Sequence, residues 1–349
     1  MKLFRFVRIS AIAALFLLYS RDLPAQQERN KYFYVAGWNL ENLFDTIKDP
    51  VKKDDEFLPG SEKRWNDARL DQKLDHLVYV INYMNQGCGP DVLGIEEVEN
   101  INVVKRLIYK MTGRDYIIVH RDSPDERGID VGLIYDRGVF DIDSVASLHV
   151  ELPDHKPTRD ILHVVLVYRN TGEKIHFYVN HWPSRRGGEL ESEKNRITAA
   201  NVLRSSLDTL NRTAPGSNVV ILGDFNDGPE NNSLAGIAGI NDFDCNSGAI
   251  PNQKFINITL KKYRAGDGTY SFKGKYEMID QILLSSSLLG NGRIRYECES
   301  FDVIKPEFMM YREGKNAGNP IPTYIGDRYI GGYSDHYPVG AKFIVKELK

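Results

Sequence analysis

The sequence contains little cysteine and no excess of positive charge. Its three cysteines, Cys88, Cys245 and Cys298, are widely spaced and form no CxxC or Cys/His pattern. At most one disulfide can form, and a thiolate metal site is not expected. The formal net charge is −3, and residues 1–25 hold four basic side chains against one acidic, so the rest of the chain is more acidic still. That charge argues against a protein that holds nucleic acid over its whole surface.

The N-terminal apolar run, residues 9–19, is too short for a membrane span, which needs about 20 residues. It follows Lys2, Arg5 and Arg8 and leads through Ala25 into a polar stretch. This order is typical of a secretory signal peptide. We therefore predict cleavage near Ala25, export to the periplasm or the medium, and no stable membrane anchor afterwards. The absence of a cysteine near the cleavage region disfavours a lipid-anchored protein.

The chain has the ordinary composition of a soluble globular protein. Hydrophobic residues make up 42% and charged residues 27% of the 349 positions, enough to bury a sizeable core. No internal repeat and no Pro/Ser-rich linker divides it. We predict one domain over residues 26–349 and a monomer.

Short apolar strands alternate with amphipathic helices along the chain, which favours an α/β fold. The expected strands are 32–38, 91–99, 116–119, 128–135, 161–168, 175–180, 219–222, 278–284 and 339–345, and the expected helices are 62–86, 103–111 and 189–210. We expect a solvated acidic loop at 45–61 and a loop-rich segment at 230–275.

The stretch 218–229, NVVILGDFNDGP, contains a buried strand that ends at Gly223 in polar residues. Asp224 and Asn226 are two positions apart, so an extended chain places them on one side and turns Phe225 into the core. Their oxygens suit a hard cation, and a carboxylate can act as acid or base. The alternative is a loop that merely caps the strand, since Asn, Asp and Gly favour turns.

Other strands end in the same kinds of side chain. The full set is Asn39, Glu97, Asp130, His181, Asp224, Asn226, Asp280, Asp335 and His336. If these strand ends meet at one rim, they offer oxygen ligands and two imidazoles without a thiolate. That chemistry predicts Mg²⁺ or Mn²⁺, with Ca²⁺ also possible, rather than zinc. Glu96 and Glu97 point to opposite sides, so only one of them is expected to face this site.

Seven motifs occur in an order that resembles the endonuclease/exonuclease/phosphatase superfamily, which includes deoxyribonuclease I. They are WNLEN, EEVE, RGIDVGLIYD, NHWPSR, GDFND, MIDQIL and SDHYPV. The resemblance extends over about residues 32–346. It implies a four-layered α/β/β/α sandwich, in which two packed, mostly antiparallel sheets have helices outside and the active site at the sheet edges.

The resemblance also implies roles for the residues that match the motifs. Asn39, Glu97 and Asp335 would hold the metal, with Glu97 as the main carboxylate. Asp224 would orient or deprotonate the attacking water. Asn226 would contact the phosphate or a second metal.

Two histidines would face the scissile phosphate. His336 would be held in one tautomer by Asp280, an Asp–His pairing that favours the imidazolium. His181 would be the second phosphate-facing imidazole, with Asp130 as its carboxylate partner.

Two basic features leave their roles open. Arg185 and Arg186 could clamp a phosphate or simply flank the following helix. A second cluster could stack bases and contact phosphates, or be an ordinary surface. It comprises Lys261, Lys262, Tyr263, Arg264, Tyr270, Phe272, Lys273 and Lys275.

The function expected from these features is exported, metal-dependent hydrolysis of phosphodiesters by in-line attack of water, with DNA or RNA as substrate. One alternative is a phosphatase or phosphodiesterase for small or lipid phosphates. Another is an inactive binding protein on the same scaffold, which the presence of Glu97, Asp224, His181 and His336 disfavours.

Overall fold

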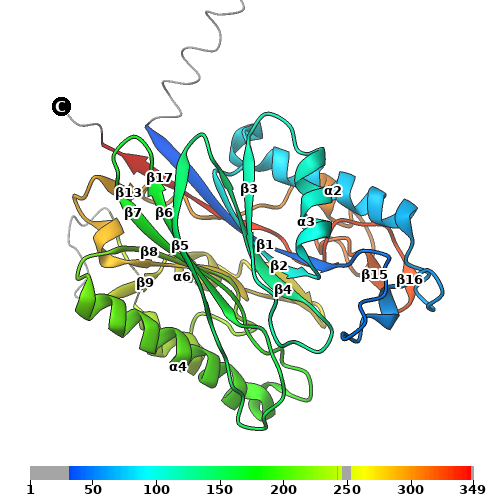
Figure 1. Cartoon of the computed structure of the whole chain (residues 1–349). Coiled ribbons are helices and arrows are strands. Elements are labelled where there is room, and N and C mark those ends of the chain that lie inside the picture. Colours follow the sequence, from blue (N-terminus) through cyan, green and yellow to red (C-terminus); the bar gives the residue numbers. More distant parts are fainter. Residues whose placement is uncertain (1–30, 242, 246–252, 347–349) are drawn as a thin grey trace, which may run out of the picture.

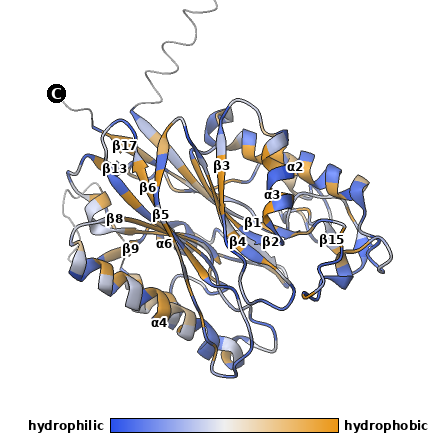
Figure 2. Cartoon of the chain, viewed as in Figure 1, coloured by the Kyte–Doolittle hydropathy of each residue, from blue (hydrophilic) through white to orange (hydrophobic). Residues whose placement is uncertain are grey.

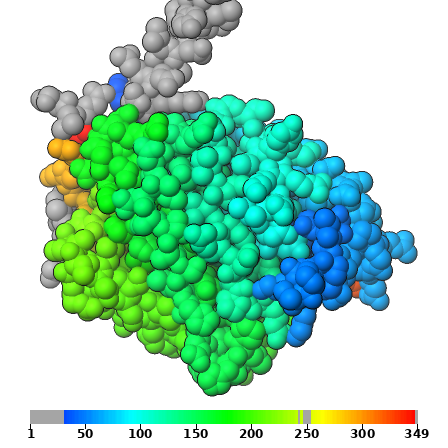
Figure 3. Space-filling view, in the orientation of Figure 1, coloured from blue at the N-terminus to red at the C-terminus, as the bar shows by residue number. Residues whose placement is uncertain are grey.

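Two β-sheets pack face to face, and helices cover their outer faces, in a computed structural model of the chain (Figure 1). The structure describes residues 31–241, 243–245 and 253–346, so the expected signal peptide lies outside the described residues. In the space-filling view the blue and cyan residues of the N-terminal part adjoin the green residues of the middle of the chain without a break (Figure 3). The predicted α/β sandwich is confirmed.

The first sheet has seven strands in the order β13-β17-β1-β2-β4-β3, with β14 beside β17. Only β1 and β2 run parallel. The strands are β1 (Tyr32–Leu43), β2 (Val92–Val98), β3 (Tyr116–His120), β4 (Asp130–Asp136), β13 (Ile294–Tyr296), β14 (Asp302–Val303) and β17 (Val339–Val345).

The second sheet has six strands in the order β5-β6-β7-β8-β12-β9, and only β7 and β8 run parallel. The strands are β5 (Phe140–Leu148), β6 (Ile161–Tyr168), β7 (Lys174–His181), β8 (Asn218–Asp224), β9 (Phe255–Asn257) and β12 (Asp280–Ser285). Two small hairpins stand apart from both sheets. They are β10 (Tyr270–Phe272) with β11 (Lys275–Glu277), and β15 (Tyr324–Ile325) with β16 (Arg328–Tyr329).

Helices α2 (Asp67–Gly87) and α3 (Ile101–Lys110) cover the first sheet, and α4 (Glu189–Thr213) lies along the second (Figure 1). The shorter helices are α5 (Asn232–Ala238), α6 (Leu260–Arg264), η1 (Asp55–Phe57), η2 (Ser286–Leu289) and η3 (Glu307–Met309). Hydropathy colouring shows hydrophobic and hydrophilic residues mixed along α4, as expected for an amphipathic helix (Figure 2). None of the helices within the described ranges is both long and apolar enough to cross a membrane.

Strand β8 is apolar at each position from Val219 to Leu222 because both of its faces are covered there. Val220 and Leu222 face the core between the sheets, whereas Val219 and Ile221 pack with α4 residues on the outer side. A strand covered on both faces needs no polar alternation. The sheets approach closely at Gly94 of β2, where a Cβ would lie only 2.7 Å from Cδ1 of Leu222.

Three segments differ from the expectations. The loop 45–61 is not wholly solvated, because Asp54 is 2% exposed and accepts hydrogen bonds from the Asp49 amide (2.8 Å) and the Lys48 ammonium. Helix α2 begins later than expected, after Asn66, whose side chain caps the amide of Arg69. Strand β5 was not expected from the sequence, and its side chains are mostly exposed, so it has no clear apolar alternation.

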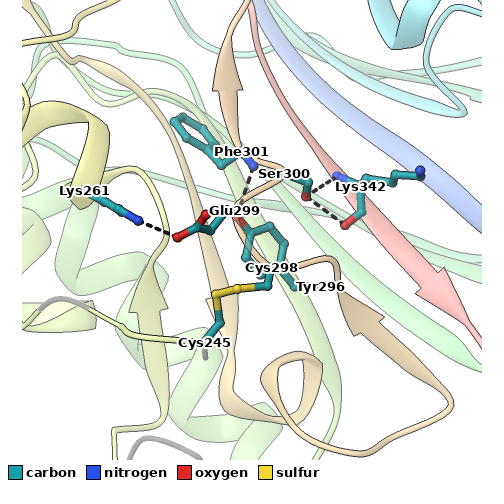
Figure 4. The surroundings of a disulfide bond; sticks show 8 residues. All are labelled: Cys245, Lys261, Tyr296, Cys298, Glu299, Ser300, Phe301 and Lys342. Carbon is teal, nitrogen blue, oxygen red and sulfur yellow. Dashed lines mark hydrogen bonds and ion pairs between the residues drawn. A yellow bond between two sulfur atoms is a disulfide. The ribbon is translucent and has the colours of Figure 1, made fainter. Parts of the chain in front are cut away.

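A disulfide joins Cys245 to Cys298, with the Cα atoms 5.7 Å apart (Figure 4). It ties the segment before β9 to the loop after β13. Cys88 is free and exposed. The sequence allowed at most one disulfide, and the structure identifies its two partners.

Candidate active site

Two pairs of parallel strands deliver polar side chains to one end of the sandwich. Asn39 lies in β1 and Glu97 in its parallel neighbour β2. His181 and Asp224 end β7 and β8, and they are direct partners in that ladder. The carboxyl ends of parallel neighbours meet at the same edge, so four of the expected site residues converge from both sheets.

Two further segments reach the same place from the opposite direction. Asp280 begins β12 and pairs with Asp224 in the antiparallel ladder. Asp335 and His336 precede β17, and the carbonyl of His336 accepts a hydrogen bond from Nε1 of Trp38 at 3.0 Å. The indole therefore fixes this segment against β1.

Five of these residues line a cleft of about 890 Å³, whereas Asn39 and Asp280 lie outside its lining and bind to Asp224 and His336. Its lining includes Glu97, Asp125, Arg127, Arg159, His181, Arg185, Arg186, Asp224, Asn226, Tyr270, Phe272, Lys273, Asp335 and His336. Acidic side chains thus share one cavity with several basic ones.

Strained backbone shapes the strand ends at this cleft. Glu97 has φ 59° and Asn226 has φ 51°, both in the left-handed region that non-glycine residues rarely adopt. The β2–β4 register shifts between Glu96 and Val98. This irregularity turns Glu97 toward the cleft and leaves Glu96 fully buried. As expected, only one of the two adjacent glutamates faces the site.

Asp224 is held in position by two donors. Its Oδ1 accepts from the Asn226 amide at 2.8 Å, and its Oδ2 accepts from Nδ2 of Asn39 at 3.1 Å. Burial, reinforced by the charge of Asp280, raises the pKa of Asp224 to about 7. A carboxylate with that pKa is suited to accept a proton near neutral pH. Phe225 is fully buried, as the alternation predicts.

His336 and Asp280 form the expected pair, with Nδ1 and Oδ2 2.8 Å apart. Burial alone would lower the pKa of His336, but the charges of Asp280, Asp335 and Asp224 outweigh it and raise the pKa well above its usual value. His336 is therefore an imidazolium at neutral pH. Its other nitrogen, Nε2, lies 3.9 Å from Asp335 Oδ1.

His181 has the opposite electrostatic character. Burial, with Arg159 and Arg127 adding to it, lowers the pKa of His181 well below its usual value, so the ring is neutral. Its Nε2 lies 3.8 Å from Glu97 Oε1 and 3.7 Å from Asp224 Oδ2. Within the described ranges its Nδ1 has no hydrogen-bond partner.

The expected pairing of His181 with Asp130 is wrong. Asp130 Oδ2 lies 3.1 Å from His120 Nε2, and its Oδ1 accepts from the Ser123 amide at 2.8 Å. The reason is the sheet topology, since Asp130 begins β4 and His120 ends the neighbouring strand β3. His181 belongs to the other sheet.

Three residues were expected to hold a metal, and the structure places Glu97 and Asp335 in the cleft. Glu97 Oε2 accepts from the Asn42 amide at 2.8 Å. Oδ1 of Asn39 already accepts from the Glu41 amide at 2.9 Å, so only its second lone pair could reach a cation.

The donor set suits a hard divalent cation. Partial burial raises the pKa of Asp335, the charges of Glu41 and Glu97 add to this, and His336 and Lys73 oppose it. This mutual repulsion of carboxylates is what a bound cation would relieve. Ligand atoms of Asp224, Asp280 and His336 also lie within 4.8 Å of one another. Oxygen donors without thiolates fit Mg²⁺ or Mn²⁺.

Several cleft residues were not assigned roles from the sequence. Arg159 is 8% exposed, and its guanidinium donates to Asp125 Oδ2 at 3.1 Å and to the Trp182 carbonyl at 2.8 Å. Within the described residues its Nε has no hydrogen-bond partner. Arg159 ends no apolar run, so no strand-end signal marks it.

A buried ion pair lies behind the acidic residues. Lys73 of α2 is 1% exposed, and its Nζ lies 3.8 Å from Glu41 Oε2. The Glu41 carboxylate also accepts from the amides of Thr323 and Tyr324 at 2.6 and 3.2 Å. Lys73 occupies an apolar helix face, where the sequence pattern predicts only core residues.

The two predicted basic features divide between the cleft and the surface. Arg185 donates to the Asn226 carbonyl at 2.8 Å and to Glu277 at 3.1 Å, so it braces the site, whereas Arg186 is an exposed part of the cleft lining. In the 261–275 cluster, Lys262 pairs with Asp302 on the surface. Phe272 and Lys273 line the cleft.

Comparison with known proteins identified one matching family model, described as the Endonuclease/Exonuclease/phosphatase family, over residues 34–345. A comparison with curated protein sequences found no significant match.

Solved structures share the fold. The human Nocturnin catalytic domain with a bound sulfate anion has a TM-score of 0.56 and 16% identity, covering 90% of this chain and 95% of its own. A Bacteroides thetaiotaomicron endonuclease/exonuclease/phosphatase family protein has a TM-score of 0.55 and 19% identity, covering 90% and 98%. The mannosyl-6-phosphatase of Bacteroides thetaiotaomicron VPI-5482 has a TM-score of 0.54 and 18% identity, covering 89% and 99%.

Proposed function

The chain belongs to the endonuclease/exonuclease/phosphatase family, and from this premise we propose that it is an exported, divalent-metal-dependent phosphodiesterase that hydrolyses DNA or RNA. The observation that carries the proposal is the convergence of Asp224, Asp280 and His336, with ligand atoms within 4.8 Å, on the cleft that also contains Glu97 and Asp335. Base, cation and metal-binding carboxylates are the groups that in-line hydrolysis of a phosphate ester needs.

Asp224 is the residue that accepts a proton from the attacking water. The Asn226 amide and the Asn39 carboxamide fix the orientation of its carboxylate. Because its pKa is about 7, it is largely ionised at slightly alkaline pH yet basic enough to take the proton.

His336 provides positive charge beside the phosphate. Asp280 accepts from its Nδ1, which leaves Nε2 as the donor toward the cleft. The imidazolium stabilises negative charge as it develops on the phosphate oxygens. The neutral His181 and the unsatisfied Nε of Arg159 add further groups that can contact an anion.

Glu97 and Asp335 are the residues that would hold the divalent cation, and Asn39, which donates to Asp224, would contribute its second lone pair. A bound Mg²⁺ or Mn²⁺ would supply charge neutralisation at the phosphate.

The distribution of charge supports a polyanionic substrate. Acidic and basic side chains share the cleft, and Arg159 is paired with Asp125 at 3.1 Å. The exposed Arg186 and Lys273 can contact the phosphates of a substrate backbone. The Cys245–Cys298 disulfide supports export, since disulfides persist mainly outside the cytosol.

The proposal is tested by assaying the protein without residues 1–25 on plasmid DNA, bis-p-nitrophenyl phosphate and a panel of phosphomonoesters and phospholipids. Each substrate is incubated with Mg²⁺, with Mn²⁺ and with a chelator, and Asp224→Asn is the blank. Metal-dependent nicking of the plasmid that is absent in the blank is the expected result. Turnover of monoesters or phospholipids with the plasmid intact would contradict it and favour a phosphatase.

A further inference from the structure

The hairpin of β10 and β11 forms a rigid arm on one wall of the cleft. Phe272 pairs with Lys275, and Lys273 and Gly274 connect the strands with φ of 49° and 77°. Positive φ at both central residues is typical of a type I′ turn, which matches the twist of a tight hairpin. The arm therefore has a defined shape of its own.

The arm is anchored directly to the catalytic residues. Tyr270 forms an isolated β-bridge with His336, and the two rings lie 4.8 Å apart. The amide of Tyr337 donates to the Thr269 carbonyl at 2.8 Å. On its other strand, Glu277 accepts from Nη1 of Arg185 at 3.1 Å. The position of the hairpin relative to His336 is thus fixed from both sides.

Phe272 is the exposed ring on this arm. Its side chain is 49% exposed, although it lines the cleft. Alternate residues of a strand share a face and lie roughly 7 Å apart, so Phe272 is one step further out than Tyr270 on the same face. The Nζ of Lys273 lies 5.0 Å from the centroid of the Phe272 ring.

Burying the exposed Phe272 ring stabilises a complex only when the ligand places a flat, apolar face against it. The Tyr270 ring lies 4.8 Å from the His336 ring, and Phe272 lies roughly 7 Å further along the strand, so a ligand held at His336 must extend along the hairpin to reach Phe272, as a nucleotide chain can. Base–aromatic stacking accepts any base, and a nearby cation can contact the backbone phosphates. A phosphate ester without a ring would gain nothing from Phe272.

We propose that the β10–β11 hairpin is a platform on which the nucleobase next to the scissile phosphate stacks against Phe272, while Lys273 contacts the nucleic-acid backbone. The ligand class is single-stranded nucleic acid or a locally unpaired nucleotide, because a base within an intact duplex has no free face. The inference rests on the proposed function and specifies how the same cleft recognises its substrate.

The test compares two short oligomers with the same sugar–phosphate backbone, oligothymidylate and a fully abasic tetrahydrofuran analogue. The ratio of their kcat/KM values isolates the contribution of the bases. We expect the wild-type protein to prefer oligothymidylate, and Phe272→Ala to lower the ratio by about 5- to 150-fold, the range given by base–aromatic stacking. Phe272→Trp should retain the preference, because indole also stacks.

Tyr109→Ala is the matched control, since Tyr109 is an aromatic residue of α3 that is 91% exposed and does not line the cleft. It should leave the ratio unchanged. Equal kcat/KM values for the two oligomers in the wild type, or a preference that persists in Phe272→Ala, would overturn the platform.

A failure of the proposed function is recognised separately. If neither oligomer is cleaved, phosphodiester hydrolysis of nucleic acid is wrong. The platform is then tested by calorimetric binding of thymidine 5′-monophosphate and 2-deoxyribose 5-phosphate to the wild type and Phe272→Ala. Tighter binding of the nucleotide that depends on Phe272 supports the platform, and equal binding overturns it.

Discussion

Oδ2 of Asp280 lies 2.8 Å from Nδ1 of His336, and Asp280 is at the same time the ladder partner of Asp224. The Asp280 carboxylate thus contacts the His336 imidazolium and also lies beside Asp224, the proposed proton acceptor. Its charge raises the pKa of His336 and also that of Asp224. The titrations of His336 and Asp224 are therefore coupled.

Replacing Asp280 should change the pH dependence as well as the rate. In Asp280→Asn the charge that raises the pKa of His336 is lost, so the imidazolium deprotonates at lower pH. We expect kcat to fall by about 10²- to 10⁴-fold and the alkaline limb of the pH–rate profile to move to lower pH.

The chain contains a matched control for this prediction. Asp130 and His120 form a similar pair, 3.1 Å apart, outside the cleft lining. Asp130→Asn should leave the shape of the pH–rate profile unchanged when activity is normalised to folded protein. If Asp280→Asn leaves the pH–rate profile unchanged, the Asp280–His336 pair does not take part in the mechanism.

Metal-free protein should lose stability as the pH rises from 3.8 to about 7. The pKa of Asp224 rises from 3.8 to about 7 on folding, so the folded state binds its proton more tightly between those values. Stability therefore falls as the pH rises through this window, by on the order of 1–4 kcal/mol for this group.

Thermal unfolding at pH 4 and pH 8 in the presence of a chelator measures this effect. Asp224→Asn should show a smaller drop in Tm between the two pH values, because the amide does not ionise. Mg²⁺ should raise the Tm of the wild type at pH 8, since a ligand of the folded state stabilises it. If the Tm difference between Asp224→Asn and the wild type is the same at pH 4 and pH 8, Asp224 does not have a raised pKa in the folded state.

The strand ends could be predicted from the sequence because each depends on local pattern. The apolar run before Asp224 and the spacing to Asn226 fix a strand, its end and the shared side of the two residues. The order of the motifs then places these ends in a known type of sandwich. The resulting fold is confirmed, and the structure brings His181, Asp224, Asp335 and His336 to one cleft.

Contacts that depend on packing between distant segments could not be predicted. The partner of Asp130 is set by the pairing of β3 with β4 and not by any spacing in the chain. Arg159 reaches the cleft from the loop before β6, and Lys73 lies on the buried face of α2, where it pairs with Glu41. Neither residue follows an apolar strand, which was the signal used to find the others.

Glu96 and Glu97 provide a paired test of metal binding. Glu97 lines the cleft, whereas Glu96 is fully buried, and none of the described residues hydrogen-bonds to its carboxylate. Burial, with the charges of Asp280 and Asp224 adding to it, raises the pKa of Glu96 well above its usual value. This environment favours the neutral form of Glu96, which a glutamine resembles in both charge and shape.

Glu97→Gln should raise the Mg²⁺ concentration for half-maximal activity at least about ten-fold, because a charged oxygen ligand is lost. Glu96→Gln should leave this concentration within about two-fold of the wild type, since no ligand charge changes. Metal titrations of activity for both variants provide the measurement. Equal effects of the two substitutions would mean that Glu97 is not the main carboxylate ligand.

The disulfide should contribute substantially to stability. It links residues separated by 53 positions, and in the chain-entropy model closing a loop of that length stabilises the folded state by about 4 kcal/mol. We expect the Cys245→Ser, Cys298→Ser double variant to lose most of this free energy of unfolding in a denaturant titration. Cys88→Ser, which changes a free and exposed thiol, should stay within about 0.5 kcal/mol of the wild type. A reducing agent can break the disulfide of the wild type, whereas the double variant has no such bond. If reduction lowers the stability of the wild type alone, the effect is due to the Cys245–Cys298 bond. Unchanged stability in both experiments would show that the bond constrains a segment that opens independently of global unfolding.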